Sequence, residues 1–291
     1  MALRGLLGDG APLSASAIDR LKAKWQMEHE EWKRQDLSTL EVVYQWADGI
    51  YVKAGLEKDK AALLVIIGAL TNGKKVFLAC ESGYRESKES WAGVLRDLKG
   101  RGLRLGRLTI ADGHLGIWSA LGELHAEGKE QRCWNHKIRN VLDCFPKRLR
   151  AEAAEQLKKI PYAETLEECE RLKNAFVERY RKDYEKAVGK LLADWDRMVT
   201  FYSFPKEHWP HLRTTNVVES PFASVRLRTD AAKRFKKVQN ATAMIWKLLQ
   251  VAEKNFRTLK GYWLLSDVYN GKTFVDGVEK QESRAIERKA A

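Results

Sequence analysis

Cysteine is scarce in this chain of 291 residues, and the few that are present form no recognisable pattern. The four are Cys80, Cys133, Cys144 and Cys169. They include no Cys-x-x-Cys pair and no even framework of the kind that holds small secreted domains together. This set argues against a disulfide scaffold and favours a reducing compartment. We therefore expect a cytoplasmic protein.

Long apolar runs are also missing. The longest, Ala61–Leu70, is too short to cross a bilayer, which takes about 20 residues in a helix. The N-terminal stretch MALRGLLGDGAPLSASA lacks the apolar segment of a secretory signal peptide. No internal repeat or low-complexity segment is visible. We expect no membrane partner, and the length fits one large domain or two ordinary ones.

Acidic residues are fewer than basic residues. The chain has 39 Asp and Glu against 52 Lys and Arg, which gives a net charge of +13 and an isoelectric point near 9.5. This balance favours a polyanionic partner, nucleic acid before membrane. The excess is concentrated between Leu212 and Arg257, where ten lysines and arginines accompany three acids. A solvated helix face is the alternative interpretation of such a cluster.

Residues typical of β-strands recur in the first half of the chain. The predicted strands are Val42–Gly55, Ala61–Leu70, Lys75–Cys80, Leu103–Ala111 and Gln131–His136. Two segments with helical apolar spacing, Ser87–Lys99 and His114–Ala126, separate the later strands. Three strands, a helix and a fourth strand form the order of a ribonuclease-H-like fold. We therefore predict an α/β (α+β) protein with a mixed five-stranded sheet and flanking helices.

Two of these strands carry an aspartate followed by glycine: Asp48 in WADGIYVK and Asp112 in TIADGHLG. Asp-Gly is also a hairpin signature, which is the structural alternative for Asp48. In a ribonuclease-H-like sheet the first and fourth strands are neighbours, so these residues would meet despite their distance in sequence. Paired carboxylates suit two Mg²⁺ ions, which prefer oxygen ligands. The sequence thus predicts a metal site here.

Glu219, in HLRTTNVVES, is the candidate third acid. Its structural alternative is a capping box with Asn216, in which the glutamate reaches back to the cap amide. Pro221 speaks against a helix that begins at Asn216, because it would lack a backbone hydrogen bond. We expect instead a helix with Ser220 as cap and Pro221 at its first position. Glu219 would then be free to coordinate metal.

Helical patterns also occupy the two flanking regions. Ser14 or Ser16 can cap a helix that runs towards Trp32. Between Lys147 and Tyr202 the sequence changes to charged helices without strands. The predicted helices there are Arg148–Lys159, Glu164–Arg181 and Tyr184–Tyr202. This region is interpreted as an all-α insertion.

Six stretches carry a family resemblance: WADGIYVK, GYRESKESW, IADGHLGIWSAL, QRCWNHKIRNVLD, FYSFPKEHW and HLRTTNVVES. From about Leu3 to Gly277 the chain resembles the Mutator-type bacterial insertion-sequence transposases. The resemblance implies an Asp-Asp-Glu triad of Asp48, Asp112 and Glu219 on a ribonuclease-H-like core, with the all-α insertion before the glutamate.

The implied function is metal-dependent strand cleavage and strand transfer. The triad would hold Mg²⁺, with Mn²⁺ as a substitute, and the expected partner is double-stranded DNA, bound by a homodimer in the bacterial cytoplasm at the nucleoid. The expected DNA contacts are Lys137, Arg226, Arg228, Lys233, Arg234, Lys236 and Lys237.

Supporting residues follow from the same resemblance. The family's Cys-x-x-His signature is present as Cys133 and His136. Zinc takes four ligands, and no further pair has a recognisable spacing. We expect His136 to line the active site and Cys133 to be a packed thiol. Arg213 and Asn216 are expected to contact phosphate or flank the site.

The expected division of the chain has five parts. They are a remnant helical N-terminal region (1–41), the first part of the catalytic core (42–146), the all-α insertion (147–203), the second part of the core with basic helices (204–280) and a charged tail (281–291).

The chain also departs from the family pattern. It retains only the last helices of the usual N-terminal DNA-binding region. Relatives tend to have proline two residues before the glutamate, where this chain has Val217. A catalytically inactive or truncated nucleic-acid-binding remnant is therefore the alternative function. A nuclease of the same fold that acts on RNA–DNA hybrids is a third.

Overall fold

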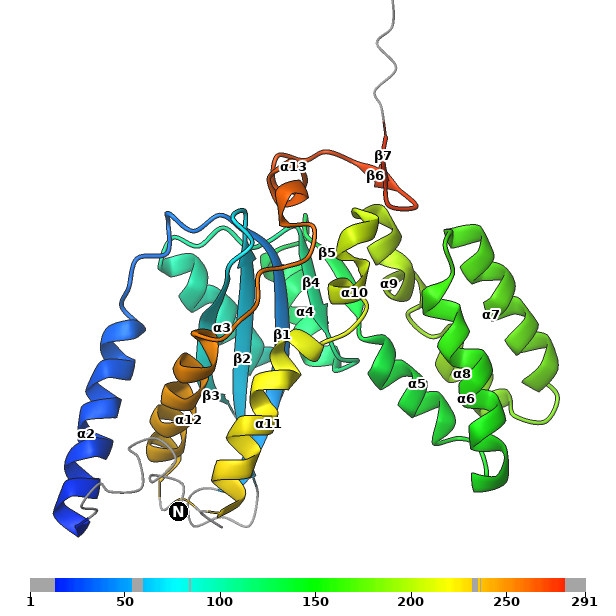
Figure 1. The fold of residues 1–291 in the computed structure, drawn as a ribbon. Coiled ribbons are helices and arrows are strands. Elements are labelled where there is room, and N and C mark those ends of the chain that lie inside the picture. Colours follow the sequence, from blue (N-terminus) through cyan, green and yellow to red (C-terminus); the bar gives the residue numbers. More distant parts are fainter. Residues whose placement is uncertain (1–13, 54–59, 84, 232–234, 236, 281–291) are drawn as a thin grey trace, which may run out of the picture.

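The protein is built on a five-stranded mixed sheet (Figure 1). The computed structural model describes residues 14–53, 60–83, 85–231, 235 and 237–280. The strands are β1 (Val42–Lys53), β2 (Lys60–Leu70), β3 (Lys75–Gly83), β4 (Leu108–Ala111) and β5 (Lys129–Arg132). Their order is β3-β2-β1-β4-β5, with β1 antiparallel to β2 and parallel to β4. The predicted ribonuclease-H-like fold and the pairing of the first and fourth strands are confirmed.

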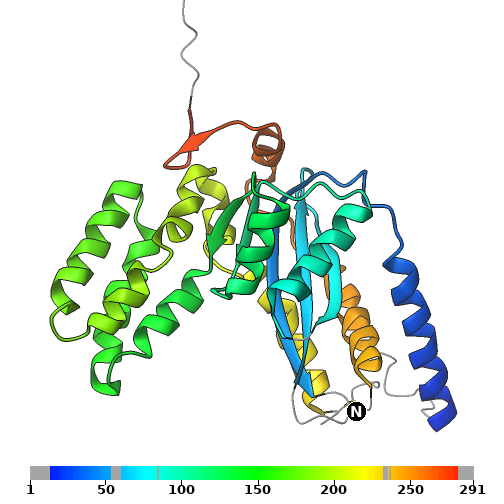
Figure 2. The same cartoon turned by 180° about the vertical axis from the view of Figure 1, so that it is seen from behind.

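Both faces of the sheet are buried, because the strands carry apolar residues on each side. Along β1, Tyr44, Trp46 and Ile50 join one core, whereas Ala47 joins the other. The first core lies beneath the helices α11 (Asn216–Ala231) and α12 (Val238–Glu253). The second lies beneath α3 (Lys88–Gly100) and α4 (Leu115–Leu124), seen in Figure 2. Alternation along one strand therefore fixes which side chains face α11.

A separate group of helices stands beside the sheet (Figure 1). It begins with α5 (Trp134–Leu142), which leaves the end of β5 and packs on α6 and α8. The further elements of this group are α6 (Arg150–Lys159), η2 (Ile160–Tyr162), α7 (Leu166–Tyr180) and α8 (Glu185–Leu192). Rings from Phe145, Phe176, Tyr180 and Tyr184 pack against one another in its core. All-α character is thus observed between residues 147 and 203.

The chain then returns to the sheet. The elements α9 (Trp195–Val199), η3 (Thr200–Ser203), η4 (Lys206–His208) and α10 (Trp209–Leu212) lead to α11. After α12 come η5 (Tyr262–Leu264), α13 (Leu265–Tyr269), β6 (Phe274–Val275) and β7 (Val278–Glu279). The buried ring of His208 ties this segment to β1: Nε2 donates to the Gly261 carbonyl at 2.9 Å, and Nδ1 accepts from the Tyr44 hydroxyl at 2.7 Å.

Several predicted boundaries differ from the structure. The fourth strand begins only at Leu108, because Gly106 packs against the backbone of Val43 and the chain before it forms a loop. The fifth strand ends at Arg132, where Cys133 starts α5. The predicted helix Tyr184–Tyr202 is broken at Asp194, which has a left-handed φ of 56°.

The N-terminal helix is α2 (Ala15–Trp32), and Ser14 is its cap, with Oγ accepting from Ala17 at 3.2 Å. Predictions for residues 1–13, 54–59 and 281–291 lie outside the described residues. Within the described part of the chain, no helix is long and apolar enough to cross a membrane.

Candidate active site

Asp48, in the middle of β1, lies beside Asp112, which follows the last residue of β4. In the parallel pairing of β1 with β4, Ala47 is opposite Ala111, and each aspartate is the next residue along its chain. Neighbouring strands are about 4.8 Å apart, so the two aspartates are close, and the charge of Asp112 acts on Asp48. Asp48 follows the alternation of Trp46 and points to the face covered by α11. Its Oδ1 accepts from the backbone of Gly49 at 2.8 Å.

Glu86 is a fourth acid at this site, and the sequence interpretation missed it. It lies in the loop between β3 and α3, directly before the cap Ser87, and is buried. Side-chain oxygens of Glu86 and Asp112 lie within 4.8 Å of each other and of a ring nitrogen of His114. A Cβ added to Gly49 would come within 2.5 Å of Glu86 Oε1. Glycine after Asp48 therefore makes room for the Glu86 carboxylate.

Glu219 reaches the site from the first turn of α11, and here the predicted helix start is wrong. The helix begins at Asn216, so Pro221 lies inside it rather than at its first position. Because the ring of Pro221 carries no N–H, the helix lacks the backbone hydrogen bond that an amide at this position would donate to the Val217 carbonyl. The Thr215 carbonyl accepts from the Glu219 amide at 3.0 Å, and the Thr215 hydroxyl donates to Glu219 Oε1. Thr215, not Asn216, holds the glutamate.

Two of the acids, Asp48 and Glu86, have raised pKa values. Asp48 is only 9% exposed. Burial raises its pKa to about 7, and the neighbouring charges of Asp112, Glu86 and Glu219 add to the shift. The pKa of Glu86 is raised for the same reasons, burial first and then Asp112. Like charges held this close disfavour ionisation unless a cation neutralises them. The arrangement therefore suits a positively charged ligand.

Cys133 and His136 stand next to Glu219. The Cys133 sulfur is buried, accepts from the Thr215 amide at 3.4 Å and lies 3.2 Å from the Thr215 hydroxyl oxygen. His136 Nδ1 lies 3.7 Å from Glu219 Oε1. A hydrogen bond to the Cys133 sulfur raises the pKa of His136 to about 9, and the charges of Glu219 and Asp112 contribute. His136 therefore brings a positive charge to the acidic cluster at neutral pH.

These three side chains could themselves bind a metal ion. Their ligand atoms lie within 4.8 Å of one another. Zinc normally has four ligands in structural sites, and no fourth protein ligand accompanies them among the described residues.

Comparison with known proteins establishes the family. The model of the family described as "Transposase, Mutator family" matches residues 5–258. The chain belongs to the Mutator family of transposases.

Among its relatives, the transposase for insertion sequence element IS6120 of Mycolicibacterium smegmatis is 44% identical over 276 residues, which cover 95% of this chain and 85% of that protein. The transposase for insertion sequence element IST2 of Acidithiobacillus ferrooxidans is 39% identical over 279 residues, covering 95% and 94%. The catalytic core domain of HTLV-2 integrase, solved in complex with magnesium, matches with a TM-score of 0.24 and 13% identity over 61% of this chain and 96% of that chain.

In this Mutator-family transposase, Arg213 and Asn216 lie near the acids but face another direction. The Asn216 side chain accepts from Asn135 Nδ2 at 3.1 Å. The Arg213 guanidinium lies over the ring of Tyr162, 4.6 Å from its centroid, and burial lowers its pKa. Among the described residues, the side chains of both form their contacts away from Asp48, Asp112 and Glu219. Their expected role beside phosphate remains a prediction.

The expected DNA contacts at the end of α11, between α11 and α12 and at the start of α12 are described only in part. Arg226, within α11, and Lys237, the residue before α12, are exposed. The side chain of Arg228 and all of Lys233, Arg234 and Lys236 lie outside the described residues. These predictions stay untested.

The prediction that Lys137 contacts DNA is wrong for this structure. Its side chain is 0% exposed, and its Nζ donates to the Lys190 and Ala193 carbonyls at the end of α8. A cation at a helix C-terminus satisfies free carbonyls and complements the helix dipole. Lys137 therefore holds α5 to α8 and is not available to DNA in this structure.

Proposed function

We propose that this chain catalyses metal-dependent DNA strand cleavage and strand transfer of an insertion sequence, with Asp48, Asp112 and Glu219 as its catalytic acids. The parallel pairing of β1 with β4 is the observation that carries the proposal, because it sets the two aspartates next to each other. The helix α11, which bears Glu219, packs on the same strand. Membership of the transposase family supports this reaction class.

The side chains present fit divalent cations. Carboxylate oxygens are the ligands that Mg²⁺ prefers, and Mn²⁺ accepts the same donors. The pKa of about 7 at Asp48 means that its ionised form needs compensating charge, which a bound cation provides. When bound, a pair of such ions activates the attacking oxygen and stabilises the leaving oxygen in phosphoryl transfer. Asp48, Asp112 and Glu219 would hold them.

The protein's own groups position the strand and balance charge. His136 is cationic at neutral pH and lies 3.7 Å from Glu219, so it limits the charge of the acid cluster and offers a donor to phosphate. The net charge of +13 favours binding to the DNA backbone, with strong salt dependence. The proposed partner is double-stranded DNA at the element ends and the target. We expect a homodimer on DNA, because two ends must be paired.

Cleavage of DNA that carries the element's ends tests the proposal. Asp48→Asn should abolish strand cleavage in Mg²⁺ or Mn²⁺ while the affinity for DNA is kept, because the amide removes a ligand charge and little volume. Glu219→Gln should behave in the same way. Lys22→Gln, at an exposed position on α2, is the matched control and should cleave like the wild type. Cleavage retained by Asp48→Asn would refute the assignment.

A further inference from the structure

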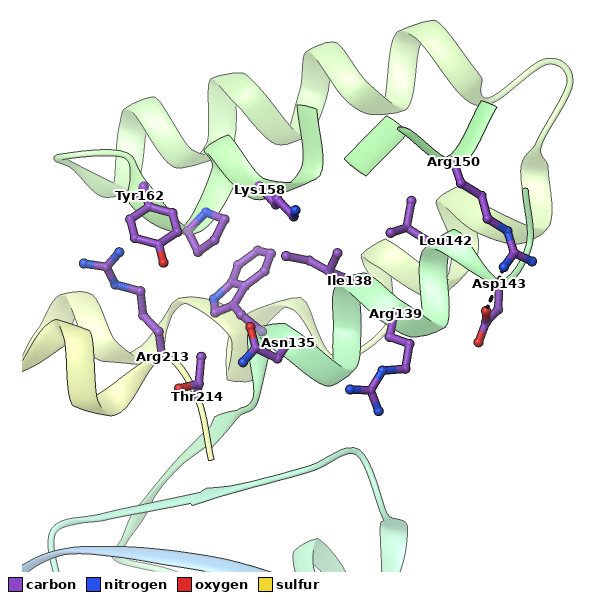
Figure 3. A pocket seen from close by; sticks show the side chains of 12 residues that line it. Asn135, Ile138, Arg139, Leu142, Asp143, Arg150, Lys158, Tyr162, Arg213 and Thr214 are labelled. Atoms are coloured by element: carbon purple, nitrogen blue, oxygen red, sulfur yellow. Dashed lines mark ion pairs between the residues drawn. The ribbon is translucent and has the colours of Figure 1, made fainter. Parts of the chain in front are cut away.

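A pocket of about 500 Å³ lies between α5 and the η2 turn, and none of the proposed catalytic acids lines it (Figure 3). Its volume is in the range of about 300–1,000 Å³ that is usual for small-molecule sites. The apolar part of its wall consists of Trp134, Ile138, Leu142 and Pro161. Such a wall accepts a flat apolar group.

Tyr162 stands at the rim of this pocket and is unusually exposed. Its side chain is 74% exposed, although it is a large aromatic residue. The Arg213 guanidinium stacks on one face of the ring at 4.6 Å from the centroid. An exposed ring that already carries a cation is a platform on which a second planar group can stack.

The polar part of the lining is cationic. Four basic side chains line the pocket together with one acid: Arg139, Arg150, Lys158, Arg213 and Asp143. The acid is paired with Arg150, with 3.6 Å between Nη1 and Oδ1. The excess positive charge favours an anionic ligand.

Arg213 lies between the pocket and a group of aromatic rings. Besides Tyr162, its guanidinium lies over Phe201 and Trp209, 5.4 and 5.9 Å from the ring centroids. Its Nε and Nη1 atoms are buried, so Arg213 contributes positive charge to the pocket wall rather than these two donors.

The pocket is joined directly to the proposed active site. The Trp134 amide donates to the Arg213 carbonyl at 2.9 Å, so two chain segments run side by side there. The same two segments continue to Cys133 and Thr215, which contact each other and Glu219. Trp134, Arg213 and Thr214 line the pocket, while their chain neighbours Cys133 and Thr215 lie beside Glu219. The pocket and Glu219 are therefore next to each other along both segments.

We infer that this pocket receives one unstacked nucleotide of the DNA strand, next to the phosphate at the acids. The base stacks on Tyr162 and lies against the apolar wall, while the positive charges of Lys158 and Arg213 attract its phosphate. This inference rests on the proposed function, because it requires a DNA strand bound at the acids. Enzymes that act on DNA often hold an extruded base in a pocket of aromatic and apolar side chains.

Binding of single-stranded oligothymidylate, followed by fluorescence anisotropy in EDTA at low salt, tests the inference. Stacking on an aromatic residue contributes about 1–3 kcal/mol per base, so Tyr162→Ala should weaken binding about five- to 150-fold. Tyr262→Ala is the matched control, since Tyr262 is also exposed but lies outside the pocket, and it should bind like the wild type. An oligomer of abasic sites should bind wild type and Tyr162→Ala equally, because it has no base to stack.

A second measurement locates the base. Oligothymidylate that carries one 5-iododeoxyuridine should form a photo-crosslink in the wild-type protein to a peptide that contains Tyr162. Equal binding of the natural oligomer by wild type and Tyr162→Ala, or crosslinks only at other surfaces, would overturn the inference. A protein that binds neither single- nor double-stranded DNA would instead refute the proposed function itself.

Discussion

Metal binding at the acids should depend on pH because Asp48 must lose its proton first. Its pKa of about 7 sets the magnitude. The fraction of ionised Asp48 rises about tenfold between pH 6 and pH 8, so the apparent dissociation constant for Mn²⁺ should fall about tenfold over that interval. The raised pKa of Glu86 acts in the same direction and makes the dependence steeper. The pKa of about 9 at His136 keeps that group charged over most of this range.

The raised pKa of Asp48 also makes the stability of the folded protein depend on pH. A carboxyl whose pKa is raised on folding favours the folded state below its unfolded pKa, near 3.8, and this contribution is lost as the pH rises through 7. The metal-free protein should therefore be destabilised by ionised Asp48 at pH 8, and Mn²⁺ should raise its melting temperature more at pH 8 than at pH 6.

Calorimetric titration with Mn²⁺ at both pH values, with melting curves alongside, measures these effects. Asp48→Asn should bind the metal more weakly and lose most of the pH dependence, while Lys22→Gln should keep both. An affinity that does not change with pH, or a dependence that is unchanged in Asp48→Asn, would contradict the electrostatic account of the site.

Three further changes probe the surrounding structure. Gly49→Ala should displace the Glu86 side chain and lower cleavage and Mn²⁺ affinity together, as measured by the assays above, whereas unchanged values would show that the close approach has no role. Lys137→Met should lower the free energy of unfolding in urea by about 1–3 kcal/mol, because two carbonyls lose their donor, while DNA affinity stays the same. Burial lowers the pKa of His208, so its stabilising effect is present above pH 6.5 and lost as the pH falls. Urea unfolding should show that the free energy of unfolding falls between pH 8 and lower pH. His208→Phe should be less stable than the wild type at pH 8 but should lose less stability as the pH falls. Equal losses in the two proteins would mean that other groups cause the pH dependence.

Much of the fold followed from local patterns in the sequence. The β-branched and aromatic runs around Trp46 and Ile110 predicted the strands, and their order along the chain predicted that Asp48 and Asp112 would be neighbours. The observed parallel register, with Ala47 opposite Ala111, agrees with that expectation. Strand ends were less accurate, because tertiary contacts of single residues decide where pairing stops.

The site was predictable only in part. Glu86 carries no signal in its own segment, since one glutamate before a capped helix is common, and its place became visible only in the structure, near Asp112 and Gly49. The start of α11 was missed because proline is favoured at the first position of a helix, whereas this helix keeps Pro221 in its interior at the cost of one backbone hydrogen bond. Lys137 was misassigned because positive charge predicts exposure, whereas its partners are two carbonyls 53 and 56 residues away along the chain.

The most direct test of the central claim is a crystal structure of the protein soaked with Mn²⁺, in which anomalous scattering locates the ions. The account predicts two ions about 3.5–4 Å apart, bound by oxygens of Asp48, Asp112 and Glu219. Ions bound at other groups, or carboxylates that stay without metal at millimolar Mn²⁺ and pH 8, would contradict it.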